Sequence, residues 1–148
     1  MDLDVAQALW TLEMLPREEM PDIAIAALEA GIDNIPVRML AGLTADDLDD
    51  AENLFEEVLK YLGRGNLTKN DAACLYTQFI SSQILRGDVE PYVGAKKIWE
   101  AALKTSDANF HNVDAFIYAA SEYEDRPSDR EFFNQEIQNE AKRWVTTT

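Results

Sequence analysis

The apolar residues of the chain recur every three to four positions, and no segment alternates apolar and polar side chains as a half-buried strand would. This period predicts an all-α fold of about eight helices. The expected helices cover residues 3–15, 22–30, 37–42, 44–62, 68–86, 91–104, 112–123 and 128–144. The connections between them are short, which favours packing of consecutive helices as α–α hairpins, an arrangement of the HEAT kind.

The fourth expected helix has the clearest pattern. Thr44 precedes it, and Asp47 follows three residues later, as in an acidic variant of the capping box. Its predicted buried face consists of Leu48, Ala51, Leu54, Phe55, Val58, Leu59 and Leu62. Gly63 and Gly65 end the helix, so we expect a hinge near residues 63–67.

The length of 148 residues suits one domain, residues 1–148, with that hinge inside it. A domain of this size buries roughly 68–70% of the surface of its unfolded chain, so it needs neither disulfide nor metal to fold. Ser81 and Ser82 have no base nearby in sequence, and no nucleophile elbow, phosphate loop or dinucleotide fingerprint is present. We therefore predict no catalytic residue and no cofactor.

Composition changes this picture through charge. The chain contains 28 Asp and Glu but only 13 Lys and Arg, a formal net charge of −15. Such a field repels phosphate backbones and anionic lipids, so neither nucleic acid nor a membrane surface is an expected partner, whereas a basic protein is. The alternative interpretation is that the acidity only keeps the protein in solution.

One acidic segment is conspicuous. Residues 46–57 contain seven acids and no Lys or Arg, although an exposed helix usually interleaves both signs to gain i,i+4 pairs. Attraction to a helix N-terminus accounts for the first of these acids but not for those several turns further on. We therefore predict a partner-binding face made of Asp46, Asp49, Asp50, Glu56 and Glu57.

Residues that could bind a metal are scarce. His111 is the only histidine and Cys74 the only cysteine, so the ligand sets of zinc sites are missing and no metal site is predicted. Cys74 lies among apolar neighbours and is expected to be buried and inert. We expect Trp99 in the core, and Gly94 at a close contact between two helices.

A single cysteine also excludes an intramolecular disulfide, which favours a reducing compartment. The acidic N-terminus lacks the positive charge of a signal peptide, and no apolar run reaches the length of a membrane span. The expected location is cytoplasmic.

Two segments carry a resemblance. Residues 26–31 with 38–43, and residues 87–95 with Ile98 and Trp99, resemble segments of small uncharacterised bacterial proteins that are acidic and all-helical. At the level of class, such proteins are similar to immunity proteins, which neutralise basic toxins. The resemblance implies no activity, cofactor or site residue.

Together these observations predict a non-enzymatic, acidic protein-interaction domain of immunity or inhibitor type that binds a basic protein. One alternative is a subunit or scaffold of a helical assembly that binds through an apolar patch. Another is an enzyme whose acids converge in three dimensions in a carboxylate-lined cleft.

Overall fold

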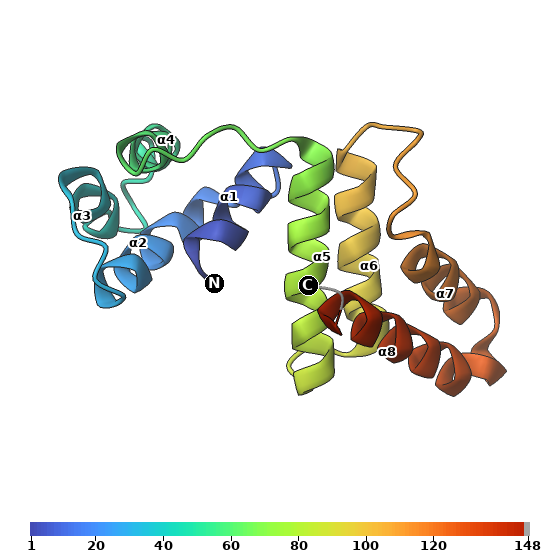
Figure 1. Ribbon diagram of the computed structural model, residues 1–148. Helices are drawn as coiled ribbons and strands as arrows, with labels where there is room; N and C mark the ends of the chain where they lie inside the picture. Colours follow the sequence, from blue (N-terminus) through green and yellow to red (C-terminus); the bar gives the residue numbers. More distant parts are fainter. Residues whose placement is uncertain (147–148) are drawn as a thin grey trace. The chain divides into compact units, whose positions relative to one another are not determined.

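A computed structural model describes residues 1–146, and all regular structure among them is helical, which confirms the predicted all-α class (Figure 1). The α-helices are α1 (Leu3–Thr11), α2 (Met20–Glu29), α3 (Ile35–Ala41), α4 (Ala51–Tyr61), α5 (Lys69–Arg86), α6 (Pro91–Lys104), α7 (Asp114–Asp125) and α8 (Arg130–Thr146). Two 3₁₀ turns, Arg17–Glu19 and Pro127–Asp129, precede α2 and α8. None of the helices within residues 1–146 combines the length and apolar character needed to cross a bilayer.

The chain divides into two compact units, Met1–Thr68 and Lys69–Thr148, here called unit 1 and unit 2. The division falls directly after the predicted hinge at residues 63–67. The expectation of one domain over residues 1–148 stays a prediction.

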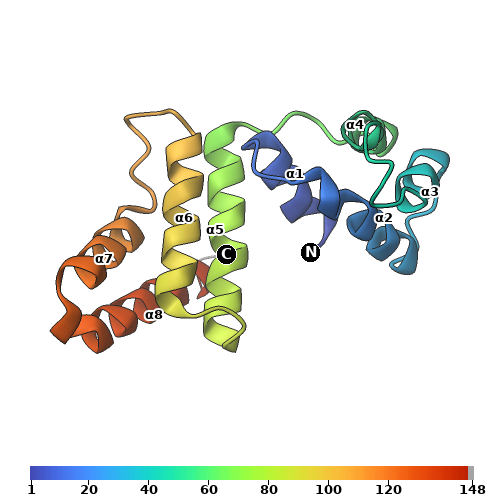
Figure 2. The same cartoon turned by 180° about the vertical axis from the view of Figure 1, so that it is seen from behind.

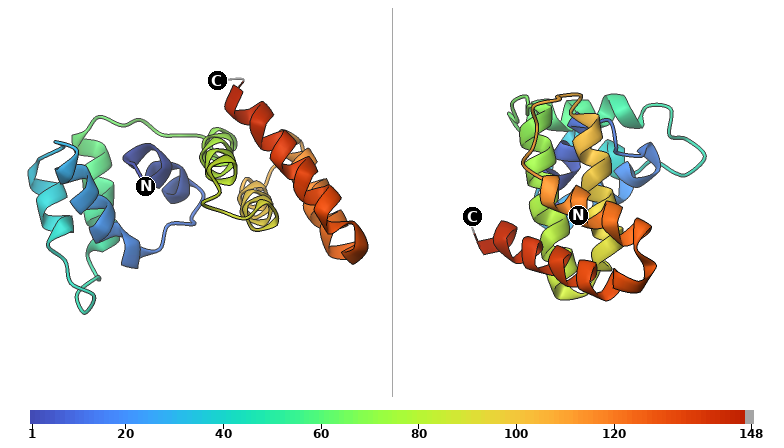
Figure 3. Two further views of the ribbon diagram at one scale, coloured as in Figure 1. Left: turned by 90° about the horizontal axis from the view of Figure 1, so that it is seen from below. Right: turned by 90° about the vertical axis from the view of Figure 1, so that its right-hand side faces the viewer.

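Unit 1 is built on α2, α3 and α4, which pack against one another. Their amphipathic spacing places Met20, Val37, Leu40 and Phe55 in a common core, where each is at most 1% exposed. Figure 3 shows that the loop between α3 and α4 extends away from these helices. This loop carries the first four acids of the segment 46–57.

The start of α4 was predicted wrongly. The helix begins at Ala51, not after Thr44, and the Asp47 N–H donates to the Thr44 carbonyl at 3.0 Å in an isolated turn. Asp50 occupies the N-cap position without a side-chain capping bond. Four Asp residues within five positions oppose a helix there, because Asp has low helix propensity and like charges four residues apart repel.

The end of α1 was also predicted too far along the chain. It stops at Thr11, because Glu13 adopts a left-handed conformation with φ 59°. The Glu13 N–H donates to the Trp10 carbonyl at 3.0 Å and the Met14 N–H to the Leu9 carbonyl at 2.8 Å, which is the bond pattern of a Schellman cap. Helices α2, α4 and α5 end with the same pair of bonds, but there the left-handed residue is glycine. These glycines are Gly31, Gly63 and Gly87, with φ of 90°, 65° and 80°.

Unit 2 contains the long helices α5 and α6 side by side, with α8 packed on α5 and α7 on both α6 and α8 (Figure 2). Gly94 sits where α6 meets α5, and a methyl group there would lie 2.6 Å from Ile84 Cδ1. This confirms that Gly94 serves helix packing. Trp99, expected in the core, is only half-buried, and the Lys96 ammonium lies 4.4 Å from the centre of its ring.

We expect Glu13→Gly to stabilise the protein. A left-handed residue with a side chain costs about 1–2 kcal/mol, and the greater freedom of glycine in the unfolded chain returns about 0.4–1 kcal/mol of that. Urea denaturation should therefore show a gain of about 0.5–1 kcal/mol in the free energy of unfolding. Gly31→Ala is the reciprocal control and should destabilise by a similar amount, since a Cβ there meets nothing within 4 Å. A loss of stability in Glu13→Gly would show that this turn is not strained.

We expect Gly94→Ala to lower the free energy of unfolding by about 1–2 kcal/mol, because the overpacking cost exceeds the better helix propensity of alanine. Adding Ile84→Val removes Cδ1 and should restore part of the loss. Gly65→Ala is the matched control, since its Cβ would enter open space. Equal stability of the Gly94 and Gly65 variants would contradict the close contact of α5 and α6.

Candidate functional site

The five predicted partner-binding residues lie on two different elements of unit 1. Asp46, Asp49 and Asp50 belong to the loop before α4, and Glu56 and Glu57 to the exposed side of α4. All five are exposed. They therefore do not form the single helix face that the sequence predicted, but a protruding loop followed by a helix surface.

Their ion pairing also differs between the two elements. Lys60 Nζ lies 3.5 Å from Glu56 Oε1 and 4.0 Å from Glu57 Oε1, so these two acids have the i,i+4 and i,i+3 partner that seemed to be missing. The cation stands just beyond the acidic segment in sequence. Within residues 1–146, by contrast, the loop acids form no ion pair. Of the five predicted residues, the three in the loop are therefore the ones without an ion pair within residues 1–146.

The two units share the net charge unequally. Residues 1–68 contain 15 acids and 4 bases, a formal net charge of −11, and residues 69–148 contain 13 acids and 9 bases, a net charge of −4. Each of the four bases of unit 1 already pairs with an acid of the same unit; these bases are Arg17, Arg38, Lys60 and Arg64. Unit 1 therefore has no basic side chain left to balance its other acids.

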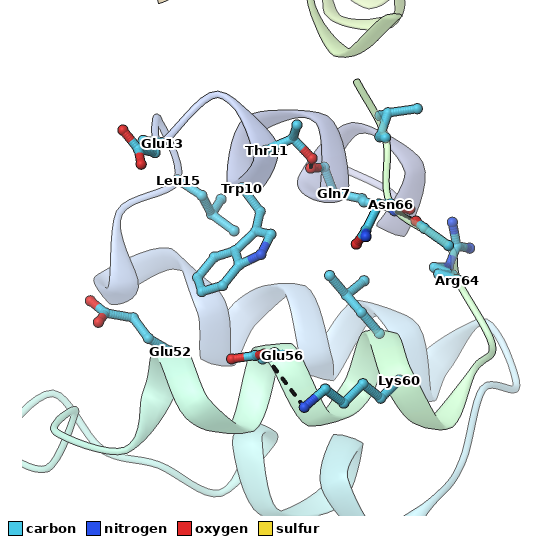
Figure 4. A pocket seen from close by; sticks show the side chains of 13 residues that line it. Gln7, Trp10, Thr11, Glu13, Leu15, Glu52, Glu56, Lys60, Arg64 and Asn66 are labelled. Atoms are coloured by element: carbon cyan, nitrogen blue, oxygen red, sulfur yellow. Dashed lines mark hydrogen bonds and ion pairs between the residues drawn. The ribbon is translucent and has the colours of Figure 1, made fainter. Parts of the chain in front are cut away.

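A cleft of about 660 Å³ lies between α1 and α4 in unit 1 (Figure 4). From α1 and the turn after it come Gln7, Trp10, Thr11, Glu13 and Leu15, and from α4 come Glu52, Glu56, Leu59 and Lys60. The chain after α4, residues 64–67, closes one end. The lining residues of each helix are spaced three or four apart, so each helix contributes one stripe to the cleft.

Two contacts hold α1 in place beside this cleft. The Gln7 side-chain amide donates to the Gly65 carbonyl at 2.8 Å, and Arg64 forms an ion pair with Asp4. The Trp10 ring packs on Phe55, with 5.3 Å between ring centres, and also lines the cleft.

Sequence reasoning did not assign Trp10, Glu13 or Glu52 to a site. The first expected helix, residues 3–15, contains both Trp10 and Glu13. The available signal was the residue after Leu12, which is an acid here, whereas glycine stands at the equivalent position after α2, α4 and α5.

Unit 2 contains a polar and aromatic cluster of a different kind, where α6 meets α7. The Glu124 carboxylate accepts a hydrogen bond from the Tyr92 hydroxyl at 2.9 Å and pairs with Lys96 Nζ at 3.1 Å. Tyr92 stacks on Tyr123, with ring centres 4.3 Å apart, and the Arg130 guanidinium lies 4.8 Å from the Tyr123 ring centre. The Lys96 hydrogen bond, followed by that of Tyr92, holds the pKa of Glu124 below its usual value. Since each charged group in the cluster has a partner, we interpret the cluster as a structural link between helices.

Other reactive groups are placed singly. Within residues 1–146, no three His, Cys, Asp or Glu side chains are arranged to hold a metal ion, and His111 pairs only with Asp114, at 3.0 Å. Cys74 is half-buried rather than buried, and its sulfur accepts a hydrogen bond from the Asn112 amide at 3.6 Å. A smaller cleft of about 280 Å³ beside Asn112 contains an ion pair between Glu140 and Arg143, whose charges cancel.

Comparison of the chain with models of protein families, with curated proteins and with solved structures found no match. The resemblance to acidic helical bacterial proteins stays a prediction.

We expect Cys74 to react slowly in the native protein. Burial raises the pKa of its thiol and the Asp71 carboxylate adds to the rise, so the reactive thiolate is scarcer at neutral pH than for a free cysteine. Labelling with iodoacetamide should be slower in buffer than in urea at pH 7, and the native rate should increase at a higher pH than the rate of a free cysteine. Equal rates in the two solvents would show that the thiol is unprotected.

Proposed function

We propose that the chain is a non-enzymatic, acidic protein-interaction domain that binds a basic protein, in the manner of an immunity or inhibitor protein. The binding face is the acidic loop and the exposed side of α4, which contribute Asp46, Asp49, Asp50, Glu56 and Glu57. The observation that supports this most directly is the exposed loop whose acids have no ion-pair partner within residues 1–146.

Long-range attraction contributes more to this binding than individual contacts do. Unit 1 has a net charge of −11 and its four bases are already paired, so its field is not cancelled locally. Such a field accelerates encounter with an oppositely charged protein by about 10- to 1000-fold at low ionic strength. Repulsion between neighbouring loop acids costs stability, and a basic partner relieves that cost on binding.

One observation favours the alternative of a helical assembly. Ile35 and Met39, four residues apart on one side of α3, are 68% and 55% exposed. Binding through such an apolar face strengthens or stays constant as salt rises, whereas binding through exposed charge weakens. Salt dependence therefore separates the two functions.

The enzyme alternative depends on the cleft, which does contain carboxylates from Glu13, Glu52 and Glu56. Acid–base catalysis requires that such groups converge on one reacting atom. In the cleft, Glu56 is paired with Lys60, and the three acids come from the turn after α1 and two successive turns of α4. This arrangement suits recognition of a cation better than proton transfer.

We expect the triple variant Asp46→Lys, Asp49→Lys, Glu57→Lys to bind the basic partner much more weakly than the unmodified protein does. The protein and the variant would each be immobilised and exposed to an extract of the cells that make the protein, at 20 and 500 mM salt. The unmodified protein should retain a basic protein at low salt and release it at high salt. The retained basic protein would then be purified. In stopped-flow measurements at 20 mM salt, its association rate with the variant should be at least about tenfold lower than with the unmodified protein.

The matched control is Glu18→Lys, Asp22→Lys, Glu29→Lys, which changes the charge of unit 1 equally but leaves the proposed face intact. It should bind nearly as well as the unmodified protein. Equal losses in both triple variants would mean that only net charge matters. Retention that persists at 500 mM salt and is lost in Ile35→Ser, Met39→Ser would favour the apolar alternative instead.

A further inference from the structure

Two carboxylates in the cleft of unit 1 have no cation beside them. The cations that line the cleft are Lys60 and Arg64, and both are already engaged, Lys60 with Glu56 and Arg64 with Asp4. Within residues 1–146, no ion pair reaches Glu13 or Glu52. The cleft therefore has a surplus of negative charge, and its natural ligand has positive charge.

The same cleft has an aromatic and aliphatic wall. Trp10 is half-buried, rests on the fully buried Phe55 and contributes its remaining surface to the lining, beside Leu15 and Leu59. Figure 4 shows the indole projecting from α1 towards α4, with Glu13 on the α1 side and Glu52 and Glu56 on the α4 side. A ligand with an alkyl stem and a flat cationic end matches both parts of this lining.

We propose that the cleft between α1 and α4 binds an arginine side chain of the basic partner, with the guanidinium against the Trp10 indole and its charge balanced by Glu13 and Glu52. This inference rests on the proposed function, because it identifies which side chain the partner inserts. Arginine suits the cleft better than lysine, since its planar guanidinium stacks on indole and donates in parallel to carboxylate oxygens. A volume of about 660 Å³ lies within the range of ligand sites and holds one arginine with its flanking backbone.

The conformation of Glu13 agrees with this role. Helices α1, α2, α4 and α5 end in the same bond pattern, and three of them use glycine at the left-handed position. At α1 the chain has Glu, whose side chain lines the cleft. Among residues 1–146, the other residue with a side chain and a positive φ is Ser106, at 54° after α6. A left-handed turn therefore tolerates a side chain but gains no stability from it. Glu13 places a carboxylate at the cleft, which glycine at this position would not do.

The test uses the tripeptide Gly-Arg-Gly, acetylated and amidated, as the probe. Its matched control contains citrulline, which has the shape of arginine without the charge. The ¹⁵N-labelled full-length protein has three indole N–H signals, and Trp10→Phe identifies that of Trp10. We expect the arginine peptide to shift the Trp10 signal saturably and to leave those of Trp99 and Trp144 unchanged. The citrulline peptide should shift none of them, and a lysine peptide should bind more weakly.

Variants then test the two carboxylates. Glu13→Gly and Glu52→Gln should each lower the affinity for the arginine peptide by about two- to fivefold, which is the effect of losing one exposed charge pair. The combined variant should lower it further. Glu13→Gly is informative because it removes the carboxylate while relieving the backbone, so weaker binding cannot result from a less stable fold. Asp22→Asn, an exposed acid of α2 outside both the cleft and the proposed binding face, is the control and should bind like the unmodified protein.

The outcomes separate the two proposals. A Trp10 signal that stays fixed up to 20 mM arginine peptide, an equal shift with the citrulline peptide, or unchanged affinity in the combined Glu13→Gly, Glu52→Gln variant would each overturn the cleft as an arginine site. The proposed function would survive if the loop variant still lost a basic protein. If instead the peptide binds as expected but no basic protein is retained in a salt-sensitive way, the proposed function fails and the cleft stands as a site for a free guanidinium compound.

Discussion

The burial of one side of α4 determines both the core and the candidate site of unit 1. Phe55 and Val58 are almost wholly buried against α2 and α3, and this fixes the rotation of the helix about its axis. Glu52 and Glu56, one turn apart, must then lie on the side that faces α1 and the cleft. Trp10 completes the arrangement by resting on Phe55 from the other side. A change that weakened the packing of Phe55 would therefore move the cleft carboxylates as well.

The helices were predictable because their information is local and repeated. The period of the apolar residues placed all eight within residues 1–146, and Gly31 and Gly87 marked two of their ends correctly. Errors arose where two local signals compete. Thr44 with Asp47 resembles a capping box, but the four Asp residues that follow disfavour a helix, and the structure has a loop there. The first helix was expected to extend to residue 15, but the chain has already turned at Glu13.

The cleft could not be predicted, because its two walls are far apart in sequence. Nothing near Trp10 indicates that Glu52, more than forty residues later, lines the same space. The acidic segment 46–57 was visible in the sequence, but its division into a loop with unpaired acids and a helix neutralised in part by Lys60 required the placement of side chains. Trp99 is half-buried rather than part of the core, and the Lys96 ammonium one turn earlier lies over its ring, a contact that the apolar pattern does not indicate.

The two units balance their acids by different means. In unit 2, Glu124 pairs with Lys96 and accepts a hydrogen bond from Tyr92. The Arg130 guanidinium lies over the neighbouring Tyr123 ring, so each charged group of the cluster has a partner within it. In unit 1, the bases are too few, and the acids without an ion pair within residues 1–146 include all four in the loop before α4 and two, Glu13 and Glu52, that line the cleft. Both places also depart from what stability alone favours: four crowded Asp residues before a helix, and a side chain at a turn where the other helices of this kind have glycine. Crowded loop acids and a left-handed Glu13, both next to an aromatic cleft, are the physical basis of the proposal that unit 1 serves recognition.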